Sequence, residues 1–123
     1  MPLTSKYLFV ASMDVDPDRQ ALLEDVYDTD HIPHIASVAG VRSVTRFKRR
    51  DLTLMIGGER KRIELENEPR STVLYEIDDP DVLLSDEWAQ QVELGRWSSQ
   101  VRPFTKNRRL VLLERVGASQ TRS

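Results

Sequence analysis

The two histidines of this 123-residue chain, His31 and His34, lie three positions apart and have acidic neighbours. An imidazole titrates near neutral pH, so it can accept and donate protons under physiological conditions. Asp30 directly precedes His31 and could orient its ring, as a partner group often does for a catalytic base. This stretch therefore predicts a proton-transfer site in which His31 and Asp30 are the catalytic residues, although Asp28 could orient the ring instead, or His31 could merely cap the helix with His34 on the surface.

The helix that leads into this stretch has an inner face that changes from apolar to polar. Residues spaced by three or four share a helix face, and here they are Leu23, Val26, Tyr27, Asp30, His31 and His34. Buried polar groups are costly unless they are paired, hydrated or used on a ligand. Pro33 lacks a backbone N–H and disfavours helical backbone before it, so we expect the helix to break or kink near His31.

Five further residues are candidates for holding a substrate. Tyr27 and Tyr75 could hold or polarise a carbonyl or phenol oxygen, and Arg46 could pair with an anionic group. His34 and Trp88 complete the set. Each has an ordinary alternative, because aromatic residues are common in cores and a basic strand face is often simply solvated.

A metal site is not expected. His31 and His34 have usable spacing and Asp28 and Asp30 offer oxygens, but Pro33 disrupts the register and the chain has no further histidine and no cysteine. A haem is not expected on similar grounds, although either histidine could in principle be an axial ligand. The glycine pair at 57–58 lacks the following Lys-Ser/Thr of a phosphate loop. We therefore expect no cofactor.

The composition of the chain limits the classes of partner that we expect. The chain has 18 basic and 20 acidic residues, a net charge of −2, so no global basic field favours nucleic acid or a membrane surface. No apolar run approaches the roughly 20 residues of a membrane span, and the N-terminus lacks the pattern of a signal peptide. We expect a cytoplasmic protein with a single domain over 1–116 and a flexible tail over 117–123.

Local patterns predict the secondary structure. Asp16, Asp79 and Ser85 are good helix N-caps, and Pro17 and Pro80 suit a first turn. Alternation and turn residues predict strands at 6–13, 41–50, 71–77 and 109–116, helices at 17–31 and 80–94, a hairpin at 52–66 around Gly57-Gly58, and an irregular segment at 97–104. This order is that of an α+β, ferredoxin-like β-α-β-β-α-β sandwich with an inserted β-hairpin.

Three segments carry a resemblance to a known family. Residues 26–35 read Val-Tyr-Asp-Thr-Asp-His-Ile-Pro-His-Ile, residues 38–47 read Val-Ala-Gly-Val-Arg-Ser-Val-Thr-Arg-Phe, and residues 75–83 read Tyr-Glu-Ile-Asp-Asp-Pro-Asp-Val-Leu. Over about 7–116 the chain resembles dimeric α/β-barrel proteins of the EthD-like group. It departs from them at Ala39, where that group often has proline, and in the longer connection at 52–66.

The resemblance implies a homodimer, in which two sheets pack face to face as a dimeric α/β barrel, with a pocket between each sheet and its helices. It also implies a small-molecule ligand that is aromatic or polyketide-like. Cofactor-independent cyclases, dehydratases, decarboxylases, isomerases and monooxygenases use this scaffold, which alone does not select among them. The alternative is a non-catalytic ligand-binding or interaction homodimer, in which Asp30 and His31 form a structural pair.

Overall fold

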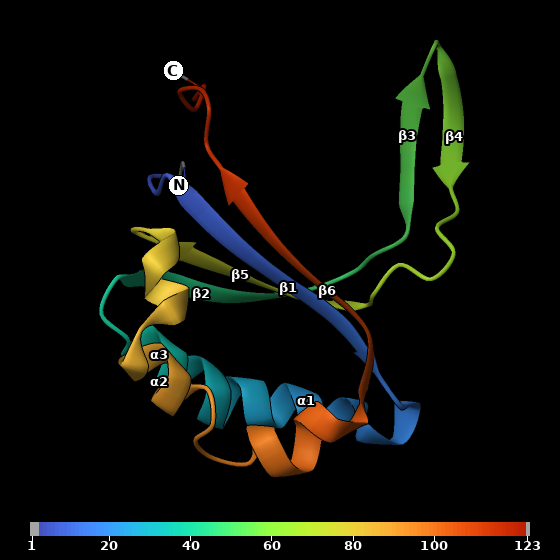
Figure 1. The fold of residues 1–123 in the computed structure, drawn as a ribbon. Helices are drawn as coiled ribbons and strands as arrows, with labels where there is room; N and C mark the ends of the chain where they lie inside the picture. Colours follow the sequence, from blue (N-terminus) through green and yellow to red (C-terminus); the bar gives the residue numbers. More distant parts are fainter. Residues whose placement is uncertain (1–2, 123) are drawn as a thin grey trace.

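A four-stranded antiparallel sheet forms the centre of the protein, for which a computed structural model describes residues 3–122. Its strands lie in the order β2-β5-β1-β6 (Figure 1). Their bounds are β1 Tyr7–Val15, β2 Val41–Lys48, β5 Ser71–Ile77 and β6 Thr105–Glu114. All four strands were predicted, but β6 begins at Thr105 rather than near 109.

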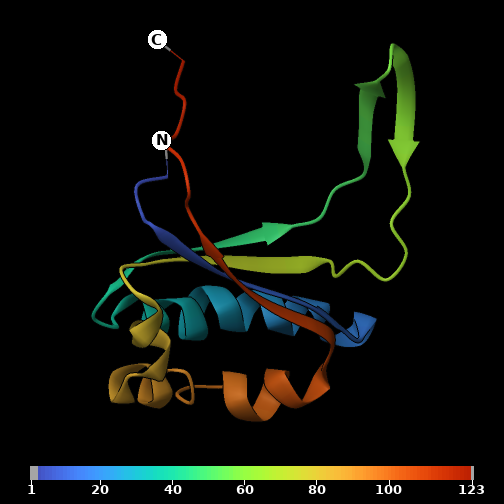
Figure 2. The same ribbon diagram turned by 45° about the horizontal axis from the view of Figure 1, so that its top comes forward.

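Two helical segments cover one face of this sheet (Figures 1 and 2). The first contains a 3₁₀ turn, helix α1 (Gln20–Val26), a π-turn at Tyr27–His31 and helix α2 (Ile32–Ala36). The second contains a 3₁₀ turn at Pro80–Leu84, helix α3 (Asp86–Gln91), a π-turn at Trp97–Val101 and a 3₁₀ turn at Arg102–Phe104. Among the residues described, no helix is long and apolar enough to cross a bilayer.

Strands β3 (Leu52–Ile56) and β4 (Glu59–Ile63) form a separate two-stranded sheet. Gly57 and Gly58 join them with φ of +60° and +81°, a backbone that glycine adopts without strain. The predicted hairpin is thus present. It extends away from the domain on the side opposite the helices (Figures 1 and 2).

The core lies between the sheet and the helical segments. Leu23 and Val26 of α1 are fully buried, as the helical spacing predicted. Alternate residues of β1 and β5 point toward them, because successive side chains of a strand face opposite sides. The buried strand residues are Ala11, Met13, Val15, Ser71, Val73, Tyr75 and Ile77. This packing positions the inner-face aromatic residues described below.

The α-helix is interrupted near His31 as predicted, but by a π-turn at Tyr27–His31 rather than by a helix end. The chain stays helical to Ala36, because a π-turn precedes the proline and the Ile32 N–H donates to the Tyr27 carbonyl five residues back. The wider turn accommodates a residue that cannot donate, and such π-turns often occur at functional sites. It also corrects the predicted inner face: Tyr27, His31 and Ile35 are buried, whereas Asp30 and His34 are only half-buried.

The segment at 97–104, predicted to be irregular, is also helical. The Arg102 N–H donates to the Trp97 carbonyl in a second π-turn, and Pro103 follows. In both segments an aromatic residue precedes a proline by six positions, as in Tyr27 and Pro33. The same spacing therefore gives the same local structure twice.

The predicted caps are confirmed at two of three positions. The Asp79 carboxylate accepts from the Asp81 N–H at 2.8 Å, and the Ser85 hydroxyl accepts from the Trp88 N–H at 3.1 Å. The Asp16 side chain caps nothing and instead accepts from Lys106 Nζ at 3.0 Å. The flexibility of the tail stays a prediction, and its last residue, Ser123, lies outside the described residues.

Candidate functional site

A cavity of about 290 Å³ lies between the inner face of the sheet and the helical segments. The sheet contributes Phe9, Ala11, Met13, Tyr75, Arg108 and Leu110 to its lining. The helical segments and the loop after α3 contribute Tyr27, His31, Trp88, Val92, Glu93, Trp97 and Arg102. A mostly aromatic wall with a few polar groups is typical of a small-molecule site.

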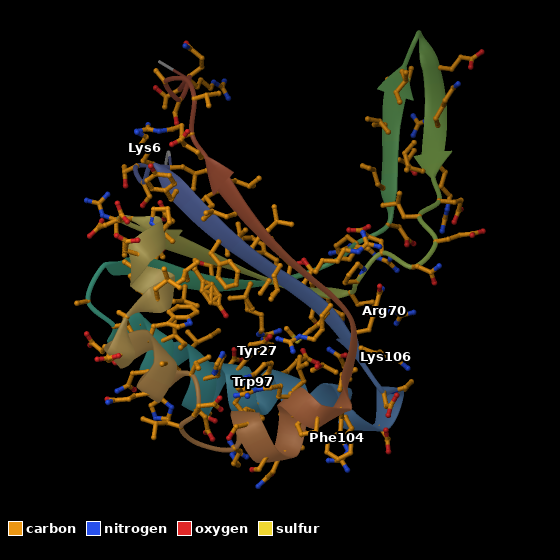
Figure 3. All side chains as sticks on the ribbon, viewed as in Figure 1. Lys6, Tyr27, Arg70, Trp97, Phe104 and Lys106 are labelled. Carbon is orange, nitrogen blue, oxygen red and sulfur yellow. The ribbon has the colours of Figure 1, made fainter. Side chains whose placement is uncertain are left out.

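The two π-turns bring three rings together. His31 stacks on Trp97 with ring centroids 4.5 Å apart and an interplanar angle of 23°. Tyr27 lies 5.1 Å from Trp97 and 5.7 Å from His31. Figure 3 shows Tyr27 and Trp97 close together beneath the sheet. Packing on two sides therefore fixes the plane of the His31 imidazole.

His31 is a buried, neutral imidazole. Its side chain is 3% exposed, and Nδ1 has no hydrogen-bond partner among the described residues. Burial, helped by the Arg102 guanidinium and His34 and opposed by Glu93, lowers the pKa of His31 to about 4. At neutral pH this side chain is therefore unprotonated and can accept a proton.

A second aromatic cluster also lines the cavity. Phe9 meets Tyr75 edge-on at 5.1 Å and Trp88 at 5.9 Å, and Tyr75 lies 5.6 Å from Trp88. Two of these residues come from the neighbouring strands β1 and β5, where Phe9 pairs with Tyr75. A planar ligand in the cavity could therefore contact ring edges and faces.

The two cavity tyrosines keep their protons. Burial raises the pKa of both Tyr27 and Tyr75 well above the ordinary value, and only the nearby Arg108 and Arg46 guanidinium groups oppose this. The Tyr27 hydroxyl donates to Met13 Sδ at 3.4 Å, which is a weak acceptor. Both phenols can therefore donate a hydrogen bond to a ligand oxygen.

The cavity lining carries one uncompensated positive charge. Arg102 donates to both carboxylate oxygens of Glu93, so these two charges cancel. Arg108 lies on β6 and forms no ion pair with any residue between 3 and 122. It is close enough to the Tyr27 and Tyr75 phenols to lower the pKa of each. The cavity thus favours an anionic ligand.

Asp30 does not contact the His31 ring as predicted. Its carboxylate accepts from Arg96 Nε at 2.9 Å, from the Arg96 backbone N–H at 3.0 Å, and from Thr29. These contacts hold the pKa of Asp30 well below its usual range. Gly95 allows this approach, because a Cβ there would lie 3.0 Å from Asp30 Oδ2. Asp30 instead ties the first helical segment to the loop after α3.

Arg46 and His34 also lie outside the cavity lining. Arg46 donates to both oxygens of Asp28 at 3.0 Å and pairs with Glu24 at 3.6 Å, so its charge is already used. His34 points toward Gly95, where its Cε1 would be 3.3 Å from an added Cβ. Of the seven predicted site residues, the structure brings four into the cavity: Tyr27, His31, Tyr75 and Trp88.

Sequence reasoning missed Trp97, Arg102 and Arg108. The first two lie in the segment interpreted as irregular, although its aromatic-to-proline spacing repeats that of residues 27–33. Arg108 was placed before the last strand, whereas β6 begins at Thr105. No signal short of the strand register assigns Arg108 to the inner face.

Between residues 3 and 122, no three His, Asp or Glu side chains come together in an arrangement that could hold a metal ion.

Comparisons with known proteins show the fold. The chain is similar in structure to a point mutant of MhuD with two manganese protoporphyrin IX molecules per active site: the TM-score is 0.56 at 11% identity, over 94% of this chain and 99% of that one. It is also similar to the haem-degrader MhuD from Mycobacterium tuberculosis, with two haems in its active site: 0.54 at 13% identity, over 93% and 99%. The fold is ferredoxin-like.

This fold confirms the predicted α+β, ferredoxin-like class. No protein-family model matches the chain, and no curated protein matches it. At such low identity the likeness extends to the fold, and function has to be argued from the cavity.

Proposed function

We propose that this protein is a small-molecule enzyme that moves a proton on an aromatic, anionic substrate, with His31 as the proton carrier. The observation that carries the proposal is the state of His31: its imidazole lines an aromatic cavity, is neutral at physiological pH, and forms no hydrogen bond with the described residues, Nδ1 being buried and Nε2 being the nitrogen left for a ligand. A purely structural histidine would have its nitrogens paired, since buried polar groups normally are.

The neighbours of His31 suit a proton abstraction next to a carbonyl. The imidazole accepts a proton from carbon, and the electron pair moves onto the carbonyl oxygen. The Tyr75 hydroxyl, which keeps its proton, donates to that oxygen as negative charge develops. The imidazolium then returns the proton to a different atom of the substrate. Isomerases, cyclases and dehydratases share this first step.

The charge of the cavity adds a role for Arg108, which would pair with a substrate carboxylate or phenolate. An anion in the cavity would also act together with Glu93 against the Arg102 charge, which lowers the pKa of His31. Substrate binding would then raise this pKa toward neutrality, where proton transfer is most efficient. His31 thereby becomes a stronger base when an anion occupies the cavity.

The haems of the similar structures do not fit this cavity. Its volume of about 290 Å³ is at the lower limit of small-molecule sites, roughly 300–1,000 Å³, and a tetrapyrrole is a large ligand. The His31 ring stacks on Trp97, and its Nδ1 lacks the hydrogen bond that usually orients a metal-binding histidine. We therefore route no step through a haem.

A homodimer is part of the proposal. The outer face of the sheet carries an apolar surface that the helices do not cover, and exposed patches of this kind commonly mark protein interfaces. The resemblance of residues 26–47 to the EthD-like group supports the same assembly and a small-molecule ligand. The non-catalytic alternative keeps the ligand and the dimer but removes the proton transfer.

The test uses phenylpyruvate, an aromatic keto acid with an acidic C–H beside its ketone. Both tryptophans of the chain, Trp88 and Trp97, line the cavity, so their fluorescence reports binding. Exchange of the C–H for deuterium, followed by proton NMR, reports proton transfer. We expect phenylpyruvate to quench the fluorescence and to exchange faster with protein than without it.

Matched variants assign the roles. Arg108→Gln should raise the Kd for phenylpyruvate about tenfold, whereas Arg109→Gln, on the neighbouring residue that pairs with Glu68, should leave it unchanged. Binding without accelerated exchange would favour the non-catalytic alternative. Equal affinity for phenylpyruvate and for its uncharged methyl ester would contradict the anion preference.

A further inference from the structure

The β3–β4 hairpin, residues 52–63, is an arm that packs on nothing in its own protomer. It forms its own two-stranded sheet, and both views show it extending away from the helices (Figures 1 and 2). A lone two-stranded hairpin is only marginally stable in water. An arm of this kind therefore gains stability from whatever covers it.

The strand register divides the arm into an apolar and a polar face. Directly opposite residues share a face, and the pairs on one side are Leu52–Ile63, Leu54–Lys61 and Ile56–Glu59. The other side carries Thr53–Arg62 and Met55–Arg60. Leu52, Leu54 and Ile56 remain 46%, 38% and 47% exposed. Alternation of this type is the signature of a half-buried strand, yet here the burying surface is missing.

The outer face of the main sheet has the same character. By register it carries apolar residues from all four strands: Leu8, Val10, Phe47, Leu74, Val111 and Leu113. Phe47, Val111 and Leu113 are 45–50% exposed. The arm leaves the end of β2 on this same side of the sheet (Figure 1). One occupant could therefore cover both surfaces.

The length of the arm makes a second copy the occupant that fits. Packed sheets lie about 10 Å apart, whereas five residues of strand rise about 17 Å. In a face-to-face dimer, which is the assembly proposed above and on which this inference rests, each arm would extend beyond the interface and lie along the partner. A twofold interface uses the same patch on both copies, so one pairing covers both arms.

Charge indicates where the arm would lie. Residues 76–87 contain six acidic residues and no Lys or Arg, and they follow the end of β5 that is remote from the arm. Lys61 projects from the apolar face of the arm, where it pairs with Glu59 at 3.7 Å and stays exposed, while Asp81 is exposed and forms no ion pair with the described residues. A twofold axis across the strands would bring each arm to this acidic end of the other copy.

We propose that the β3–β4 arm clasps a second copy of the chain, with Leu54 on the partner's apolar surface and Lys61 facing the acidic segment 76–87. The arm is thus a dimerisation device built onto the sheet, and the two arms of a dimer are equivalent.

Two glutamate variants test the clasp by sedimentation equilibrium. Leu54→Glu should weaken the dimer about tenfold or more, since a charge would be buried on the contact face. Thr53→Glu, on the neighbouring residue of the opposite face, should leave the dissociation constant within about twofold. Circular dichroism of each variant checks that the exposed arm substitutions leave the domain folded.

Cross-linking tests the position of the arm. The chain contains no cysteine, so Lys61→Cys with Asp81→Cys supplies one pair of thiols per protomer for a short bismaleimide. A covalent dimer is expected. A dimer that is insensitive to Leu54→Glu, or that fails to cross-link, would overturn the clasp while leaving the proposed dimer intact. A wild-type monomer at micromolar concentration would overturn both, and phenylpyruvate exchange would still test the cavity separately.

Discussion

The two faces of the sheet differ in how their apolar residues are covered. On the inner face, α1 and the two π-turns bury Leu23, Tyr27 and Trp97 almost completely. On the outer face, Phe47 and Leu113 remain about half exposed, as do the residues of the arm. The inner face is covered by side chains of its own chain over β1 and β5, whereas Leu110 and Leu112 of β6 on this face remain 57% and 46% exposed. The outer face needs a surface as large as itself.

The two faces also differ in the kind of side chain that they carry, which suits the inner face to ligand chemistry and the outer face to association. The inner face contains groups with perturbed protonation, a neutral His31 and two protonated phenols, which are the marks of a reactive site. The outer face carries mainly apolar and short polar side chains. Changes on the inner face should therefore alter ligand chemistry or folding, whereas changes on the outer face should alter association.

The largest effect is expected from His31→Phe, which keeps an aromatic ring against Trp97 but removes the proton carrier. Proton exchange in phenylpyruvate should fall about 10²–10⁴-fold, while sedimentation should show an unchanged dimer. If exchange persists at the wild-type rate, the inner face binds its ligand without catalysis by His31.

Leu23→Ala should have the next largest effect, because Leu23 is fully buried on the inner face. We expect a loss of about 2–5 kcal/mol in the free energy of unfolding, measured by urea denaturation. Leu54→Ala, in the exposed arm, should cost far less under conditions where the protein is monomeric. Similar losses of unfolding free energy in the two variants would contradict the conclusion that the inner face is buried and the arm is not.

Acid should weaken folding through His31. Its pKa is about 4 in the folded state and about 6.5 when exposed, so the unfolded chain binds more protons between these values. Stability is therefore lost as the pH falls through this window, by about 2–3 kcal/mol between pH 7 and 4.5. Denaturation of His31→Phe should show a smaller loss, and an equal loss in both proteins would contradict this assignment.

The sequence predicted the sheet well because alternation and turn residues are local signals. Strands at 41–48 and 71–77 and the Gly57-Gly58 turn needed no information beyond their own residues. Pro33 predicted the interruption of the helix but not its form, because its rule describes an α-helix and the chain adopts a π-turn instead. That turn moved Asp30 and His34 off the inner face.

The site was only half predictable, for a related reason. Tyr27 and His31 follow from helical spacing, but Trp97 and Arg108 come from distant segments that only the fold brings near them. The Asp30 interaction with Arg96 joins residues 66 positions apart, and no local pattern indicates such a contact. Any sequence offers a charged side chain several residues of opposite charge, and the sequence alone does not show which of them it pairs with.

The smallest effect is expected from Arg46→Gln. This guanidinium pairs with Asp28 and Glu24 at the surface, outside the cavity, and such pairs contribute about 0–1 kcal/mol. The Kd for phenylpyruvate, measured by tryptophan fluorescence, should stay within about twofold of the wild-type value. A tenfold increase in this Kd would show that Arg46 takes part in ligand binding.

The most direct test of the proposed proton carrier is an NMR titration of its imidazole. Because the chain has two histidines, the variant His34→Gln leaves His31 as the only imidazole signal. The account predicts a pKa of His31 well below 6.5, near 4 in the wild-type protein, that rises when phenylpyruvate binds. A pKa close to 6.5 that does not respond to phenylpyruvate would contradict it, because His31 would then be an exposed histidine with no connection to the cavity.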